Sequence, residues 1–172
     1  MIISLIGYMG SGKSHISKLL SQKINFKLID LDQQIILKHQ KKISEIFAER
    51  GEIFFRKEEK SILEEILKLD DNIVLSLGGG TPVYYNNMEL INQKSKSIFL
   101  QASVSTLTER LLRQKVKRPL IARLSDEELP EFIAKHLFER NTFYSQANYT
   151  INTNNKSPEE IVDEIIATLD IR

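Results

Sequence analysis

The chain has 172 residues, about the length of one domain with a substantial hydrophobic core. Its formal net charge of +1 argues against a general attraction to nucleic acid or anionic lipid, and the absence of cysteine excludes disulfides and thiol nucleophiles. No apolar run reaches the roughly 18 residues that a membrane-spanning helix needs, and the apolar stretch Ile2–Ile6 is too short for a signal peptide. We therefore expect a cytoplasmic protein with neither nucleic acid nor a membrane as a partner.

Short apolar runs alternate with helical patterns from one end of the chain to the other. The runs typical of strands are Ile2–Ile6, Phe26–Ile29, Ile73–Leu77, Ser97–Leu100 and Tyr149–Ile151. The segments typical of helices are Lys13–Gln22, Asp32–His39, Ser44–Arg50, Glu52–Leu69, Asn86–Gln93, Val104–Arg113, Glu127–Ser145 and Pro158–Leu169, the last with Ser157 as its N-cap. Short apolar strands between helices imply a parallel sheet covered on both faces. The predicted fold is a single α/β domain over residues 1–172, with three αβα layers and a central five-stranded parallel sheet.

A glycine-rich motif joins the first predicted strand to the first predicted helix. Residues Gly7–Ser14, called the phosphate loop below, match G-x-x-x-x-G-K-[ST] at every required position. Glycines let backbone N–H groups approach phosphates closely, and the helix amino end adds roughly half a positive charge. Lys13 can reach the β- and γ-phosphates, and the Ser14 hydroxyl can bind Mg²⁺. The candidate nucleotide-binding residues here are Gly10, Ser11, Gly12, Lys13, Ser14 and His15.

The alternative to a nucleotide site is a glycine-rich turn that binds nothing. Chance places the whole motif in under about 1% of chains of this length, and its flanking strand and helix lower that figure further. The motif therefore favours a fold of the P-loop kinase type. The histidines of the chain are interpreted as surface residues.

Two carboxylates, Asp30 and Asp32, end the second predicted strand. In extended chain their spacing points both side chains the same way, with Leu31 opposite. Asp30 could support Mg²⁺ through water, while Asp32 could hydrogen-bond a substrate hydroxyl and accept its proton. The alternative is that one of them only caps the next helix.

A second charged group lies further along the chain, where Glu52, Arg56 and Glu59 would share one helix face. An arginine between carboxylates is a planar fork suited to a substrate carboxylate. Spacing alone nevertheless favours the alternative of a surface ion-pair ladder, worth under about 1 kcal/mol. The glycine turn Gly78–Gly80, which follows the third strand, offers bare backbone amides to an anion.

A cationic stretch without acidic residues runs from Arg110 to Arg123. Its cations are Arg110, Arg113, Lys115, Lys117, Arg118 and Arg123. A solvated loop or a nucleic-acid patch are the alternatives, and the second is disfavoured because few aromatic residues interleave the stretch. We favour a lid over residues 110–124 that closes on a triphosphate, excludes water and brings Arg118 to the transferring group.

Taken together, these motifs resemble the shikimate kinase family. The phosphate loop, the pair Asp30 and Asp32, the run Gly51–Glu59, the glycine turn and Arg118-Pro119-Leu120 occur in the family's order, and the resemblance covers essentially the whole chain. It implies transfer of the γ-phosphoryl group of ATP to the 3-hydroxyl of shikimate in aromatic amino-acid biosynthesis. We expect ATP and shikimate as partners, Mg²⁺ as cofactor, and a monomer.

The same resemblance implies particular roles for residues across the chain. The implied substrate-binding residues are Asp32, Arg56, Gly78, Gly79, Gly80 and Arg140, and a helical segment over residues 32–60 is expected to hold the substrate. Arg113 is implied to lie near adenine. Residues 153–158 resemble the family's adenine-binding loop, with Lys156 in place of the more usual arginine.

The predicted mechanism is in-line phosphoryl transfer that depends on positioning and charge neutralisation. Lys13, Asp32 and Arg118 are the candidate catalytic residues, and Ser14 and Asp30 are the candidate metal residues. One alternative is a kinase for another hydroxy acid or polyol such as gluconate, which gives no reason for two carboxylate-reading arginines. The other is a nucleotide-binding protein without turnover, against which the intact catalytic residues argue.

Overall fold

The structure is a computed structural model that describes residues 1–171 apart from 116, 117 and 119. Within those residues, five strands form one sheet in the order β2-β3-β1-β4-β5, and every neighbouring pair is parallel. The strands are β1 (Ile2–Ile6), β2 (Lys27–Asp30), β3 (Ile73–Ser76), β4 (Lys96–Gln101) and β5 (Tyr149–Asn152). The helices are α1 (Lys13–Lys23), α2 (Leu31–His39), α3 (Ile43–Ile66), α4 (Asn87–Lys94), α5 (Val104–Leu112), α6 (Leu129–Tyr144) and α7 (Pro158–Thr168), with a 3₁₀ turn at Thr81–Val83.

The apolar character of the strands follows their position in the sheet. All residues of β1 and β3, which lie inside the sheet, are buried. The edge strands β2 and β5 carry exposed residues such as Lys27 and Asn152, because an edge strand has a neighbour on one side only. The predicted five-stranded parallel sheet is therefore confirmed.

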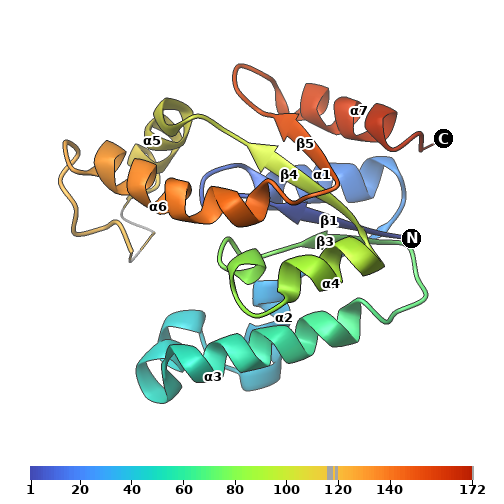
Figure 1. The fold of residues 1–172 in the computed structure, drawn as a ribbon, viewed down its shortest axis with the longest axis horizontal. Coiled ribbons are helices and arrows are strands. Elements are labelled where there is room, and N and C mark those ends of the chain that lie inside the picture. Colours follow the sequence, from blue (N-terminus) through green and yellow to red (C-terminus); the bar gives the residue numbers. More distant parts are fainter. Residues whose placement is uncertain (116–117, 119, 172) are drawn as a thin grey trace.

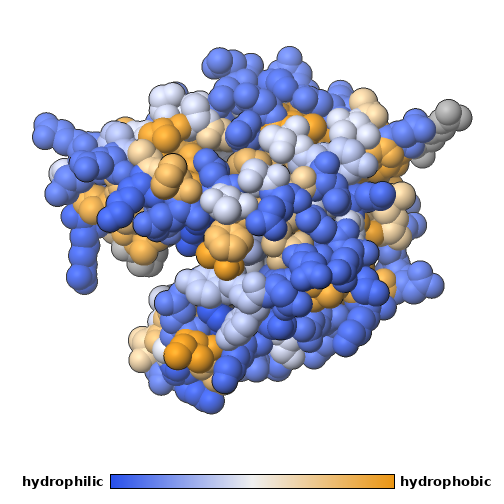
Figure 2. Space-filling view, in the orientation of Figure 1, coloured by the Kyte–Doolittle hydropathy of each residue, from blue (hydrophilic) through white to orange (hydrophobic). Residues whose placement is uncertain are grey.

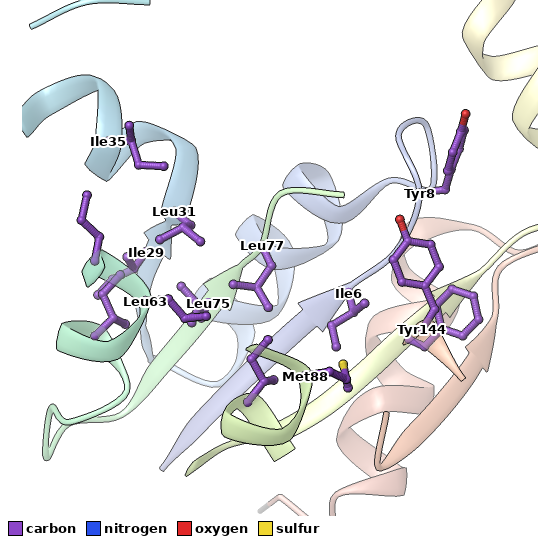
Figure 3. Packing of buried hydrophobic residues seen from close by; sticks show 14 of the residues in the cluster. Ile6, Tyr8, Ile29, Leu31, Ile35, Leu63, Leu75, Leu77, Met88 and Tyr144 are labelled. Atoms are coloured by element: carbon purple, nitrogen blue, oxygen red, sulfur yellow. The ribbon is translucent and has the colours of Figure 1, made fainter. Parts of the chain in front are cut away.

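Helices cover both faces of the sheet, as Figure 1 shows. Alternate residues of β1 point to opposite faces: Ile3 and Leu5 pack in a cluster with α1 and α7. Ile2 and Ile6 belong to the larger cluster with α3, α4 and α6, part of which Figure 3 shows from close by. The predicted three αβα layers are confirmed.

Helix α3 contains a break that the sequence analysis placed between two separate helices. Gly51 has φ 78° and ψ 173°, a left-handed backbone that a side chain would strain, so the helix changes direction there. Helix α7 begins as predicted, because Ser157 Oγ accepts from the backbone N–H of Glu160 at 3.2 Å. In the described part of the chain, none of the helices has both the length and the apolar character to span a membrane.

Candidate functional site

A cavity of about 740 Å³ opens at the carboxyl ends of the strands, where open parallel sheets bind ligands. It is flanked by the phosphate loop, the start of α2, the glycine turn, α5 and the loop before α7. Of the predicted site residues, its lining contains Gly10, Ser11, Gly12, Lys13, Ser14, His15, Asp30, Asp32, Gly78, Gly79, Arg118 and Lys156. Figure 2 shows a notch in the surface on the left, between the part of the molecule that contains α6 and the part that contains α3.

The phosphate loop has the backbone conformation that its glycines permit. Gly10 and Gly12 have φ of 80° and 96°, in the left-handed region where a side chain is strained. The N–H groups of His15 and Ile16 then donate to the carbonyl of Gly12, which begins α1. The amino end of that helix faces the cavity, so its positive partial charge is available to an anion there.

The amino group of Lys13 lies against its own loop. Nζ donates to the carbonyl oxygens of Gly7 at 2.6 Å and of Tyr8 at 3.0 Å. Burial, with smaller contributions from the guanidinium groups of Arg118 and Arg140, lowers the pKa of Lys13 to about 8 against the opposing charge of Asp32. Most of this lysine is still protonated at neutral pH, so it can neutralise a phosphate.

The two aspartates differ from the predicted extended pair, because the strand ends at Asp30 and α2 begins at Leu31. The side chain of Asp30 caps this helix by accepting from the backbone N–H of Gln33 at 3.1 Å. Asp30 therefore caps this helix, and it also lines the cavity beside Asp32. Burial raises the pKa of Asp32 to about 6, assisted by the charges of Asp30 and Glu59.

Arg56 is held by a buried carboxylate rather than by a surface ladder. Its Nη1 donates to Glu59 Oε1 at 2.8 Å, and Glu59 is only 1% exposed. Thr81 Oγ1 donates to the other oxygen of Glu59 at 2.8 Å. The interpretation of these residues as a surface ion-pair ladder is wrong for Arg56 and Glu59, because this face of α3 packs against the 3₁₀ turn Thr81–Val83 and is buried.

The glycine turn lets charged side chains come close to the backbone. A Cβ atom at Gly80 would lie 2.6 Å from Arg56 Nη2, and one at Gly79 would lie 3.2 Å from Arg140 Nη1. Tyr144, which is fully buried, donates its hydroxyl to the carbonyl oxygen of Gly79 at 2.6 Å. Arg56, Arg140 and the glycine turn therefore meet beside the cavity, although neither arginine is part of its lining.

Two of the histidines are not the surface residues that the sequence interpretation assumed, whereas His15 is exposed. His136 is partly buried, and its Nδ1 lies 2.9 Å from the Tyr8 hydroxyl. His39 is partly buried too, with Nε2 2.8 Å from Glu58 Oε2. Figure 3 shows the Tyr8 ring at the tip of the loop that follows β1.

Among the described residues in the middle of the predicted lid segment, one cation reaches the cavity. Arg118 lines the cavity, and its Nη2 donates to Gln114 Oε1 at 3.0 Å. Burial lowers the pKa of this guanidinium. Lys115 instead pairs with Asp126 at 2.8 Å, and the predicted lid residues Lys117 and Pro119 lie outside the described residues.

At the start of the predicted lid segment, Arg110 lines the cavity, whereas Arg113, which was implied to lie near adenine, does not. Arg113 is 76% exposed at its side chain, pairs with Glu109 at 2.8 Å and is not part of the cavity lining. Arg110 lines the cavity and donates to the carbonyl oxygens of Gly10 at 3.3 Å and Thr153 at 3.3 Å. Lys156 is in the lining and forms an ion pair with Glu164.

Several residues of the site were not among the candidate catalytic, binding or metal residues of the sequence analysis. They are Tyr8, Glu59, Thr81, Tyr84, Arg110 and Tyr144. Periodicity along α6 could have found Tyr144, because it lies four residues after Arg140. The contacts of Glu59 with Thr81 and of Arg110 with Thr153 join distant parts of the chain, so no local pattern signals them.

The parallel sheet and the phosphate loop together define a P-loop nucleotide-binding protein of the small-molecule kinase type. The family model described as shikimate kinase matches residues 9–170. A shikimate kinase of Flavobacterium psychrophilum is 49% identical over 165 residues, which cover 95% of each chain. The chain belongs to the shikimate kinase family.

Solved structures of the same family are also similar to this chain. The shikimate kinase of Bacteroides thetaiotaomicron superposes with a TM-score of 0.92 at 37% identity, covering 99% of this chain and 98% of that one. The shikimate kinase of Acinetobacter baumannii, solved in complex with shikimate, has a TM-score of 0.86 at 30% identity, covering 98% of this chain and 92% of that one. The family resemblance that the sequence analysis stated is therefore confirmed.

Proposed function

We propose that this protein transfers the γ-phosphoryl group of ATP to the 3-hydroxyl of shikimate, a step of aromatic amino-acid biosynthesis. The observation that carries the proposal is the position of Asp32, which lines the same cavity as the phosphate loop and lies next to the glycine turn that Arg56 and Arg140 approach. A nucleotide phosphate and a hydroxy acid bound at these two places would meet at Asp32.

At the nucleotide end, Lys13 and the amino end of α1 bind the terminal phosphates. Ser14 and Asp30 fit a Mg²⁺ site, since both line the cavity and offer the oxygen ligands that this ion prefers. In the described residues no three carboxylate or imidazole side chains gather into a metal site. If Ser14 and Asp30 hold the ion, phosphate oxygens and water would supply its other ligands. When bound, Mg²⁺ supplies charge neutralisation to the phosphates.

At the acid end, the guanidinium groups of Arg56 and Arg140 bind the carboxylate of shikimate, and the glycine turn Gly78–Gly80 admits the substrate ring close to the backbone. Asp32 accepts a hydrogen bond from the attacking hydroxyl and takes its proton as transfer proceeds. Its pKa of about 6 leaves it mostly ionised at pH 7, while making it a stronger base than an exposed aspartate.

The lid segment, residues 110–124, closes the site. Arg118 already lines the cavity and approaches the transferring phosphoryl group on closure, where such an arginine contributes about 10³–10⁵ in rate. For adenine, Arg110 and Pro158 are better placed than Arg113, because they line the cavity and Arg113 does not. Arg110→Ala is expected to raise the KM for ATP, with Arg113→Ala as the matched control.

A coupled assay of ADP release tests the proposal. We expect release that depends on added shikimate and on Mg²⁺, and little release with gluconate, because gluconate does not present the same carboxylate and hydroxyl to Arg56 and Asp32. Binding of ATP without acceptor-dependent release would instead identify a nucleotide-binding protein without turnover. We further propose that the protein is a cytoplasmic monomer. Light scattering after size-exclusion chromatography tests its oligomeric state.

A further inference from the structure

The guanidinium group of Arg56 is covered by an aromatic ring in addition to its ionic partner. The Cζ atom of Arg56 lies 4.1 Å from the centroid of the Tyr84 ring, while Nη1 donates to Glu59 at 2.8 Å. The Arg56 side chain is only 11% exposed. A ring stacked on one face and a carboxylate bonded at one edge fix both the plane and the rotation of the group.

The hydroxyl of Tyr84 has its own partner. It donates to Glu52 Oε1 at 2.6 Å, and the same oxygen lies 3.6 Å from Arg56 Nε, which is an ion-pair distance but too long for a hydrogen bond. Within the described residues, this buried Nε has no hydrogen-bond partner. Tyr84 therefore engages the carboxylate that would otherwise be the nearest competitor for Arg56.

This competition matters because Arg56 has few donors to offer. Glu59 accepts from Nη1, and both Nη1 and Nη2 face the glycine turn, because a Cβ at Gly80 would lie 2.8 Å and 2.6 Å from them. A second carboxylate bonded at Nε would further neutralise the positive charge that attracts an acid. It would also draw the guanidinium away from the turn.

We propose that Tyr84 is a positioning residue for the acid-binding Arg56: its ring fixes the guanidinium plane, and its hydroxyl restrains Glu52 from moving closer and hydrogen-bonding to Arg56 Nε. The inference rests on the proposed function, because it assumes that Arg56 meets the carboxylate of shikimate. Tyr84 itself touches no reacting atom in this scheme.

The neighbouring tyrosine is a matched control. Tyr85 has φ 53°, so its side chain leaves the backbone in a different direction and its ring lies 5.2 Å from Lys60 Nζ. Tyr85 is 52% exposed. Substitution of Tyr85 removes the same chemical group from the same segment without changing the surroundings of Arg56.

The test is steady-state kinetics of ADP release with shikimate and ATP varied separately. Tyr84→Phe keeps the ring and releases Glu52, so the KM for shikimate is expected to rise about threefold. Tyr84→Ala loses both contacts, and a rise of about tenfold is expected. The kcat, the KM for ATP, and all constants of Tyr85→Phe and Tyr85→Ala are expected to stay within about twofold of the unmodified protein.

A double variant isolates the hydroxyl. Glu52→Gln removes the competing charge, so adding it to Tyr84→Phe should return the KM for shikimate to within about twofold of the original value. A KM for shikimate that stays unchanged in both Tyr84 variants, or a KM for ATP that rises equally, would overturn the inference. Failure of the double variant to restore the KM would overturn the restraint on Glu52.

Failure of the proposed function would be recognised separately. It would appear as an absence of shikimate-dependent ADP release in the unmodified protein, before any variant is compared. Should Tyr84→Ala not fold, Tyr84→Phe and its double variant still decide the inference, because they change one hydroxyl and one carboxylate.

Discussion

A single methyl group at Gly80 is expected to disable recognition of the acid substrate. The backbone of Gly80 has φ −86° and ψ −19°, which alanine adopts without strain, so Gly80→Ala tests space alone. The added Cβ would lie 2.6 Å from Arg56 Nη2 and 2.8 Å from Nη1. To reach an ordinary contact of about 3.4 Å, the guanidinium must move by about 0.8 Å.

That movement is resisted by the partners of Arg56. Glu59 holds Nη1 at 2.8 Å, and the Tyr84 ring lies 4.1 Å from Cζ, so the guanidinium cannot retreat without weakening one of them. A displacement of about 1 Å in a binding group can cost about 10²-fold in rate. We expect kcat/KM for shikimate to fall about tenfold to hundredfold, while the KM for ATP changes less than about twofold.

The assay is ADP release at varied shikimate, repeated with Arg56→Ala and with the double variant. If the methyl group acts only through Arg56, the double variant is expected to be no worse than Arg56→Ala alone. An unchanged KM for shikimate in Gly80→Ala would refute the reasoning. So would a double variant in which the two losses multiply, since that would mean that Gly80 acts independently of the arginine.

The remaining predictions concern charge, pH and helix capping. Lys13→Ala and Arg118→Ala are each expected to lower kcat at least about 10³-fold with the fold intact by circular dichroism, and near-normal turnover in either would contradict the assigned charge neutralisation. The kcat/KM for shikimate should fall as pH drops through about 6, because protonation removes the base at Asp32, and a profile flat down to pH 5 would contradict that role. The same raised pKa means that the folded state binds this proton more tightly than the unfolded chain. Stability is therefore lost as pH rises from about 4 through about 6, and Asp32→Asn should raise the free energy of unfolding at pH 7 by about 1–3 kcal/mol, measured by urea titration. Ser157→Ala removes the cap of α7 and should lower the free energy of unfolding by about 1 kcal/mol. An unchanged free energy of unfolding would indicate that Glu160 alone caps the helix.

Local sequence patterns were sufficient to predict the strands, the helices and the phosphate loop. Short apolar runs such as Ile2–Ile6 become inner strands because both of their faces are buried, and Gly51 interrupts α3 where the helical pattern predicted a boundary. The motif at Gly7–Ser14 is contiguous, so its geometry follows from its own residues and the two elements that flank it.

The parts of the site that the sequence did not predict depend on contacts between distant segments. Spacing along one helix could not show that Glu59 is buried, because its partner Thr81 belongs to a turn 22 residues away. Likewise, the sequence presented Arg110 as one cation among several. That Arg110 and not Arg113 reaches the cavity depends on which side of α5 faces the phosphate loop. Asp30 and Asp32 were expected to lie together on extended chain. Helix α2 instead begins at Leu31, between them, so their side chains do not have the spacing of a strand.

The resting position of Lys13 has a consequence for how its removal is interpreted. By donating to the carbonyl oxygens of Gly7 and Tyr8, the ammonium group links the end of the phosphate loop to its beginning. A variant without this side chain loses these two hydrogen bonds as well as a cation, so the backbone of the phosphate loop is expected to change its conformation. The kinetic deficit of such a variant is therefore an upper bound on the worth of any one lysine–phosphate contact.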